Sequence, residues 1–205
     1  MFFYNYNKIF DFLFPKYTWR KNDEFIYLTF DDGPVPGATD VVLDILKEYG
    51  VKATFFCVGD NINKHPLLFK RIIAEGHGVA NHSYSHIRGV DTDNNTYYSD
   101  IEKCDLEIKK YGVVTSLLRP PHGRMKVSQR NLLSKKYEII MWTVLSGDFS
   151  PNVSAEGCLQ NTLKHTENGS IILFHDSLKM IEKVKKVLPQ YLESILKRGQ
   201  SFKIL

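Results

Sequence analysis

The chain has 205 residues, of which 43% are hydrophobic, and this length and composition predict one globular domain rather than a disordered chain. Its formal net charge of +4 comes from lysines spread along helix-like segments without a dense basic block, so nucleic acid is not predicted as a partner. Three cysteines, Cys57, Cys104 and Cys158, lie far apart and form no CxxC pair. They indicate neither a disulfide framework nor a cysteine zinc site, and they favour a reducing compartment.

The N-terminal segment, MFFYNYNKIFDFLF, is aromatic but interrupted by polar side chains. Large apolar side chains recur there at helical spacing, at Phe3, Tyr6, Phe10 and Leu13. We therefore expect residues 1–22 to hold a short aromatic helix that packs on the domain or, alternatively, contacts a membrane surface through residues 1–20. No signal peptide is recognised, so the cytoplasm or the cytoplasmic membrane face is the default location. No apolar run reaches the roughly 18 residues of a membrane-spanning helix.

Residues 23–205 alternate short β-branched or aromatic runs with longer segments of helical period, which is typical of a parallel sheet covered by helices. In chain order, the predicted strands are FIYLTF, KATFFCVG, GVANH, SLLRPP, YEIIMWTVL, SIILFH and SFKIL. The predicted helices span residues 39–49, 66–75, 97–111, 126–135, 154–165 and 179–198. This pattern predicts an α/β fold, a distorted seven-stranded (β/α) barrel in a single domain, with a doubly wound open sheet as the alternative.

Ionisable side chains follow five of the predicted strands, at the ends where parallel sheets gather ligands and chemistry. They are Asp31 and Asp32 after LTF, His82 and His86 after GVAN, Arg119 after SLL, Asp148 after the WTV segment, and His175 after IILF. Each one alone has an ordinary structural explanation, such as a turn for DDG or a core position for His175. Their repeated placement at strand ends predicts one shared site.

The HSYSH segment spaces two histidines four residues apart, which on a helical turn places both imidazoles on the same side. Two imidazoles and one carboxylate give a divalent metal, expected to be zinc, three protein ligands and leave positions open for water and substrate. Only one of the adjacent aspartates need bind the metal, so the other is available as a general base. Gly33 and Pro34 end the strand, which allows both carboxylates to turn toward the site.

Five ordered motifs, TFDDGP, NHSYSH, RPPHG, WTVLSGDF and LFHD, resemble those of the polysaccharide deacetylases, carbohydrate esterase family 4, also called the NodB homology domain. The resemblance covers nearly all of residues 27–205, and it assigns residues 23–205 to a distorted (β/α) barrel of that family. It implies metal-dependent hydrolysis of N-acetyl, or sometimes O-acetyl, groups on an amino-sugar polymer or oligosaccharide such as peptidoglycan or chitin. Zinc is the expected cofactor, and other divalent transition metals such as Co²⁺ are alternatives.

The resemblance also implies roles for the residues that match the motifs. Asp31 resembles the catalytic base, and Arg119 resembles the arginine that orients it. The implied metal ligands are Asp32, His82 and His86. His175 resembles the general acid that protonates the departing amine, and Asp148 the carboxylate that steadies this histidine.

Two further roles and three departures concern the substrate. The backbone N–H of His122 is expected to meet the oxyanion, and Leu173 to line the acetyl pocket. His122 stands where the family usually has tyrosine, Phe149 stands where it usually has tryptophan, and Leu145 or Ser146 lies where it usually has an aspartate. The changes at His122 and Phe149 leave backbone roles intact but alter the groove, so they bear on the choice of substrate, and the position of the missing aspartate is given no role.

Three other functions are alternatives to this one. A deformylase or deacetylase of a lipid-linked or small acetylated sugar is motivated by the aromatic N-terminus. A glycan-binding module without catalysis is disfavoured by the complete set of site residues. An iron oxygenase also uses two histidines and one carboxylate, but here the acid lies fifty positions before the histidines on an α/β chain. The oligomeric state is not predicted.

Overall fold

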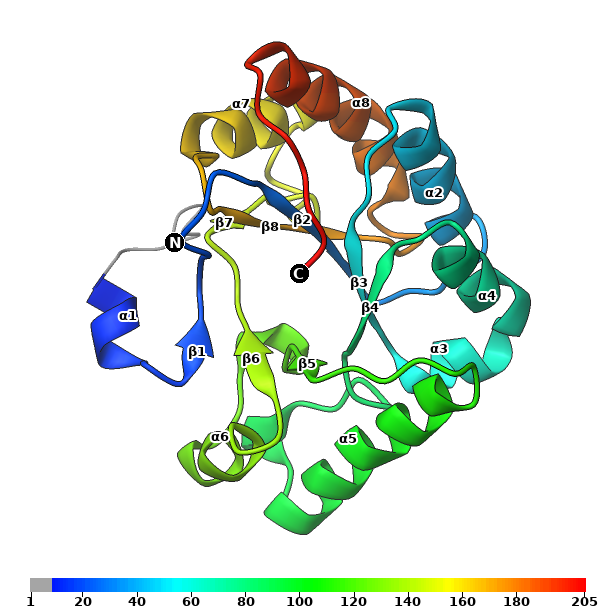
Figure 1. Cartoon of the computed structure of the whole chain (residues 1–205), viewed down its shortest axis with the longest axis vertical. Coiled ribbons are helices and arrows are strands. Elements are labelled where there is room, and N and C mark those ends of the chain that lie inside the picture. Colours follow the sequence, from blue (N-terminus) through cyan, green and yellow to red (C-terminus); the bar gives the residue numbers. More distant parts are fainter. Residues whose placement is uncertain (1–8) are drawn as a thin grey trace.

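The computed structural model describes residues 9–205, and parallel strands in this part of the chain form one curled sheet (Figure 1). The strands are β1 (Tyr17–Thr18), β2 (Tyr27–Asp31), β3 (Thr54–Cys57), β4 (Gly78–Asn81), β5 (Leu117–Leu118), β6 (Glu138–Ile140), β7 (Val144–Leu145) and β8 (Ile171–His175). Their order across the sheet is β1-β6-β5-β4-β3-β2-β8-β7. The predicted single α/β barrel is therefore confirmed.

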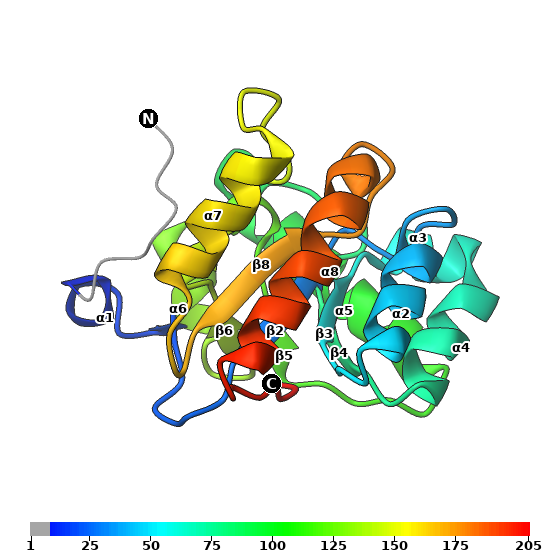
Figure 2. The same cartoon turned by 90° about the horizontal axis from the view of Figure 1, so that it is seen from above.

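Helices surround the outside of this sheet. They are α1 (Ile9–Leu13), α2 (Thr39–Glu48), α3 (Gly59–Lys64), α4 (Pro66–Ala74), α5 (Asn94–Lys109), α6 (Val127–Leu133), α7 (Ala155–His165) and α8 (Ile181–Lys197), with short 3₁₀ turns η1 (Gly89–Asp91) and η2 (Pro121–Gly123). Figure 2 shows α7, α8, α2 and α4 in a row over one face. No helix within residues 9–205 has both the length and the hydropathy required to cross a bilayer.

The predicted count of seven strands is wrong, because the described residues form eight. The YEIIMWTVL segment divides into β6 and β7. Where β6 ends, the carbonyls of Ile140 and Met141 accept hydrogen bonds from the Arg119 side chain, at 3.3 and 2.9 Å, instead of continuing a strand. The SFKIL segment makes only an isolated bridge from Phe202 to Ile26. Strand β1 was not predicted and pairs with β6 at one edge.

The six predicted helices are observed close to their predicted bounds, as α2 and α4 to α8. Helix α5 starts at Asn94, earlier than expected, because the Asp93 side chain accepts a hydrogen bond from the Thr96 N–H at 3.0 Å and caps it. Of the predicted N-terminal helix, Phe3 and Tyr6 lie outside the described residues. The Phe10 ring stacks 5.5 Å from the Trp19 ring.

Side chains of β2 alternate between the two faces of the sheet. Phe30 points to the helix layer and stacks on Phe55 and Phe174 at 5.3 and 6.2 Å. Tyr27 lies on the other face, in the apolar cluster inside the barrel that includes Phe56. Since side chains two residues apart share a face, this register directs Asp31, at the end of β2, into the barrel mouth.

Candidate active site

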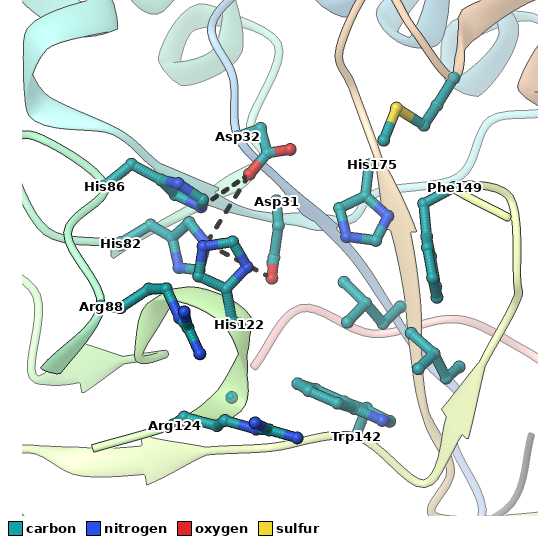
Figure 3. Close-up of a pocket in the computed structure, with 14 residues that line it drawn as sticks. Asp31, Asp32, His82, His86, Arg88, His122, Arg124, Trp142, Phe149 and His175 are labelled. Carbon is teal, nitrogen blue, oxygen red and sulfur yellow. Dashed lines mark ion pairs between the residues drawn. The ribbon is translucent and has the colours of Figure 1, made fainter. Parts of the chain in front are cut away.

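A pocket of about 650 Å³ lies where the carboxyl ends of β2, β4 and β8 meet (Figure 3). Its polar lining includes both aspartates that follow β2, both histidines that follow β4 and the histidine that ends β8: Asp31, Asp32, His82, His86 and His175. The structure thus brings together side chains separated by up to 144 positions in the sequence, from Asp31 to His175. Arg119 and Asp148, the other ionisable residues singled out at strand ends, contact members of this group directly.

The turn after β2 allows two adjacent carboxylates to face one pocket. Asp32 adopts a left-handed backbone conformation, with φ of 87°, so its side chain leaves the alternation of the strand. The carbonyl of Asp32 accepts a hydrogen bond from the Asn61 amide at 2.7 Å. The next N–H, that of Gly33, donates to Asp176 at 3.0 Å. Side chains distant in the sequence therefore hold this turn in place.

Asp176 is a buried carboxyl that the sequence reasoning gave no role. It accepts hydrogen bonds from the Gly33 N–H at 3.0 Å and from the Thr39 hydroxyl at 2.6 Å. Burial raises its pKa to about 8, although these hydrogen bonds oppose the rise. A Cβ on Gly33 would lie 1.9 Å from Asp176 Oδ2, so glycine is required there. Asp176 directly follows His175 in the LFHD motif, and this position in the sequence could have indicated its role.

The three predicted metal ligands converge on a common point. One donor atom each from Asp32, His82 and His86 lies within 4.8 Å of the other two. His86 Nε2 is 3.2 Å from Asp32 Oδ1, and His82 Nε2 is 3.8 Å from the same oxygen. This is a donor set that could hold a divalent metal.

The two histidines reach this point from a loop, so the predicted helical turn for HSYSH is wrong. Ser83 and His86 have left-handed φ values of 64° and 53°, which interrupt any helix. Side chains accept the hydrogen bonds of the loop N–H groups instead. The Ser83 N–H donates to Asn81 Oδ1 at 2.7 Å, and the Tyr84 N–H donates to Asp100 Oδ2 at 2.9 Å. These contacts shape the loop that presents both imidazoles.

The protonation states of this cluster suit a metal. His82 Nδ1 lies 2.8 Å from the Arg119 carbonyl, an acceptor, so Nδ1 carries the hydrogen and Nε2 presents its lone pair to the pocket. Burial lowers the pKa of His82 to about 4, which keeps the imidazole neutral. Burial acts to raise the pKa of Asp32, but the hydrogen bond with His86 and the charge of His175 outweigh it and hold the pKa low. Metal ligands require these deprotonated forms.

Arg119 orients the carboxylate of Asp31. The guanidinium is fully buried and lies 4.0 Å from the centre of the Phe56 ring. Its Nη1 donates to Asp31 Oδ1 at 2.6 Å and to the Thr29 hydroxyl at 2.9 Å. Asp31 Oδ2 lies 3.7 Å from His82 Nε2. One oxygen of Asp31 is therefore fixed by the arginine while the other faces the cluster of Asp32, His82 and His86.

Asp148 holds His175 on the opposite side of the pocket. Its carboxylate accepts from the His175 backbone N–H at 2.7 Å and contacts His175 Nδ1 at 2.9 Å. Burial acts to lower the pKa of His175, but the charge and hydrogen bond of Asp148 prevail and raise it to about 9. With Nδ1 engaged, the proton on Nε2 is the one available to a bound molecule. This arrangement provides a cationic proton donor near neutral pH.

The remaining wall is apolar at one end and basic at the other. Leu173, as expected, lines the pocket together with Leu145, Trp142 and Phe149. His122 also lines it, with its ring 4.9 Å from that of His86, and its φ of 58° shapes the loop that carries it. Sequence reasoning missed the pocket residues Trp142, Met180, Arg88 and Arg124. Arg124 directly follows RPPHG, a position that was available as a signal.

A family model described as polysaccharide deacetylase matches residues 19–138. The chain belongs to the polysaccharide deacetylase family. It is 34% identical over 176 residues to a peptidoglycan-N-acetylglucosamine deacetylase of Bacillus cereus, a match covering 82% of this chain and 64% of that protein. A second protein of that description from B. cereus is 29% identical over 190 residues, covering 90% of this chain and 89% of the relative.

The resemblance extends to the fold of this polysaccharide deacetylase family member. A crystal structure of a peptidoglycan N-acetylglucosamine deacetylase in complex with 4-naphthalen-1-yl-N-oxidanyl-benzamide matches with a TM-score of 0.90 and 30% identity. The match covers 98% of this chain and 95% of that chain. The family and barrel predicted from the motifs are therefore confirmed.

The turn after β2 yields a stability prediction. In Gly33→Ala, the new methyl group would collide with Asp176 and Thr39 in a buried network, so we expect a loss of about 3 kcal/mol in unfolding free energy, measured by urea denaturation. Gly112→Ala is the control, because φ there is +76° and its Cβ would meet nothing within 4 Å. We expect that control to lose only about 1 kcal/mol. Equal losses in the two variants would contradict the proposed contact.

The Asp148–His175 pair yields a pH prediction. In metal-free Asp148→Asn, the pKa of His175, about 9 in the parent, should fall toward the ordinary value of about 6.5, as measured by NMR titration of the imidazole. Because the folded state binds this proton more tightly, the pair's stabilisation is complete below pH ~6.5 and is lost as pH rises through about 9. Unfolding free energy of the parent should therefore fall across that window, and the fall should be reduced in the variant. An unchanged titration would contradict Asp148 as the cause.

Proposed function

We propose that this chain is a metal-dependent deacetylase that hydrolyses N-acetyl groups of an amino-sugar polymer or oligosaccharide, peptidoglycan or chitin-like, to a free amine and acetate. The observation that carries the proposal is the convergence of Asp32, His82 and His86 between the oriented carboxylate of Asp31 and the cationic His175. The substrate class is supported by the similar proteins, which are named as deacetylases of peptidoglycan N-acetylglucosamine.

Zinc is the proposed metal, because two imidazoles and one carboxylate are a common zinc donor set that leaves open positions, and Co²⁺ is the alternative. A divalent ion bound there would polarise the acetyl carbonyl and increase the acidity of water. Asp32, His82 and His86 would hold it. The hydrogen bond from His82 Nδ1 to the Arg119 carbonyl would fix one of these ligands in the required tautomer.

The chain's own residues would handle the protons. Asp31 Oδ2 is the atom proposed to take a proton from the attacking water, because Arg119 occupies the other oxygen. His175 would deliver a proton to the amine nitrogen as the carbon–nitrogen bond breaks, and Asp148 would keep its imidazole cationic until then. The backbone N–H of His122 is proposed to stabilise the oxyanion. Leu173 would contact the acetyl methyl group.

The base assignment is tested with Asp31→Asn. The variant should retain zinc binding by calorimetry, because Asp31 is not a proposed ligand, and should lose about 10²- to 10⁴-fold in acetate release from chitin and peptidoglycan oligosaccharides. Asp44→Asn, at a carboxylate that is 70% exposed and outside the pocket, is the matched control. Equal turnover in Asp31→Asn and parent would remove Asp31 from the base role. Glycan binding by the parent without any acetate release would favour the non-catalytic binding module.

A second candidate, a deacetylase or deformylase of a lipid-linked sugar, is favoured by the exposed apolar side chains of α1. Phe12 and Leu13 are 85% and 53% exposed. Because removal of residues 1–20 would also delete β1, the double substitution Phe12→Ser and Leu13→Ser is the better probe. We expect it to abolish sedimentation with lipid vesicles if this helix contacts a membrane. Leu67→Ser, at another exposed leucine, is the control, and unchanged sedimentation in the double variant would exclude the contact.

A further inference from the structure

Two arginines that the proposed chemistry does not use line the pocket on the side of His122. Arg88 lies in the loop between His86 and η1, and Arg124 directly follows η2. Both side chains belong to the pocket lining and both are exposed. Figure 3 shows them along one wall, beside His122 and Trp142 and away from His175.

The two loops that carry these arginines are joined through one buried side chain. Gln129 is fully buried, and its Nε2 donates to the carbonyls of Gly89 and Thr92 at 3.0 and 3.2 Å. Its Oε1 accepts from the Lys126 N–H at 2.8 Å. A Cβ on Gly89 would lie 3.1 Å from the Cα of Met125, so the backbones are in close contact as well. The arginine-bearing segments are therefore held at a fixed separation before any ligand binds, which lowers the entropic cost of binding.

The charge on this wall is not balanced within the pocket. The two carboxylates of the lining are committed to other partners, Asp31 to Arg119 and Asp32 to His86. Arg88 has an ion pair with Asp91 at 2.9 Å, in which both side chains are largely exposed, and such pairs contribute little. Arg124 has no ion pair within residues 9–205. The outer wall therefore carries excess positive charge next to the proposed site of deacetylation.

We propose that Arg88 and Arg124 form a subsite for an anionic group, a carboxylate or a phosphate ester, on the sugar next to the one that loses its acetyl group. This inference rests on the proposed function and narrows its substrate class to anionic glycans. A planar guanidinium binds either anion through paired hydrogen bonds, which an ammonium cannot match. The Trp142 ring packs against Gly123, between His122 and Arg124, and offers an apolar face to a sugar ring. A glycan strand whose alternate sugars carry a lactyl carboxylate would meet all of these groups, whereas a neutral chitin oligomer would leave the arginines without a partner.

The test compares four tetrasaccharides of equal length: a neutral N-acetylglucosamine oligomer, one with lactyl carboxylates on alternate sugars, the same molecule with each carboxylate converted to a methylamide, and one with phosphate esters. Acetate release is measured with zinc for the parent, Arg88→Gln, Arg124→Gln, the double variant and Arg124→Lys. Lys135→Gln, which removes an exposed positive charge outside the pocket, is the matched control. Binding of the same oligosaccharides is measured separately in the Asp31→Asn background, where turnover does not interfere.

We expect the parent to prefer a charged substrate over the methylamide by at least about tenfold, and each glutamine substitution to reduce that preference about tenfold. Arg124→Lys should retain part of the preference, added salt should weaken it, and Lys135→Gln should leave it unchanged. The carboxylate and phosphate arms decide which anion is the better ligand. An equal response of the parent to charged and amidated substrates, or an unaltered preference in the double variant, would overturn the inference. Acetate release from none of the substrates would contradict the proposed function instead, and the binding data would still decide the arginine subsite.

Discussion

The buried contact between Arg119 and Asp31 is the interaction on which the rest of the site depends. A guanidinium without solvent contact is costly, and here the cost is offset by hydrogen bonds to Asp31, to the Thr29 hydroxyl and to two carbonyls of the β6–β7 connection. The backbone carbonyl of the same arginine contacts His82 Nδ1. One residue therefore orients the proposed base, selects the tautomer of a proposed metal ligand and shapes the sheet between β6 and β7. Its removal would leave Asp31 buried beside the proposed metal ligands without the charge of the guanidinium.

Near that contact, the fold shifts the pKa values of two histidines in opposite directions. Burial lowers the pKa of His82 to about 4, although the hydrogen bond to the Arg119 carbonyl opposes this shift. His175 is held by Asp148, and its pKa rises to about 9. A neutral imidazole is suited to bind a metal, whereas a cationic imidazole is suited to donate a proton. Both histidines lie at the ends of parallel strands at the same barrel mouth, and their pKa values differ because burial outweighs the nearby carboxylates at His82, whereas Asp148 outweighs burial at His175.

The pocket combines a centre of ionisable residues from the strand ends with a wall of basic and aromatic side chains. Near the centre, the side chains match the family motifs and the architecture matches a solved deacetylase closely. Beside this centre, His122 and the two arginines present a basic surface on one side, and Phe149 contacts His175 on the other. The proposed chemistry and the proposed choice of substrate are thus assigned to different parts of the same cavity. Buried Gln129 joins the loops that carry the two arginines through hydrogen bonds, as Arg119 joins residues of the central group.

By itself, the sequence determined six of the helices, the barrel class and the group of ionisable residues at strand ends, because hydrophobic period and strand-end placement are local properties of the chain. It also identified Asp31, Asp32, His82, His86 and His175 as one group. Only the tertiary structure decided the division of YEIIMWTVL into two strands, the pairing of β1 at the sheet edge and the loop conformation of HSYSH. It alone disclosed the roles of Asp176 and Gln129. Each of these features depends on hydrogen bonds between residues distant in the sequence, such as Arg119 with Met141 or Gly33 with Asp176, and no local pattern records such a partner.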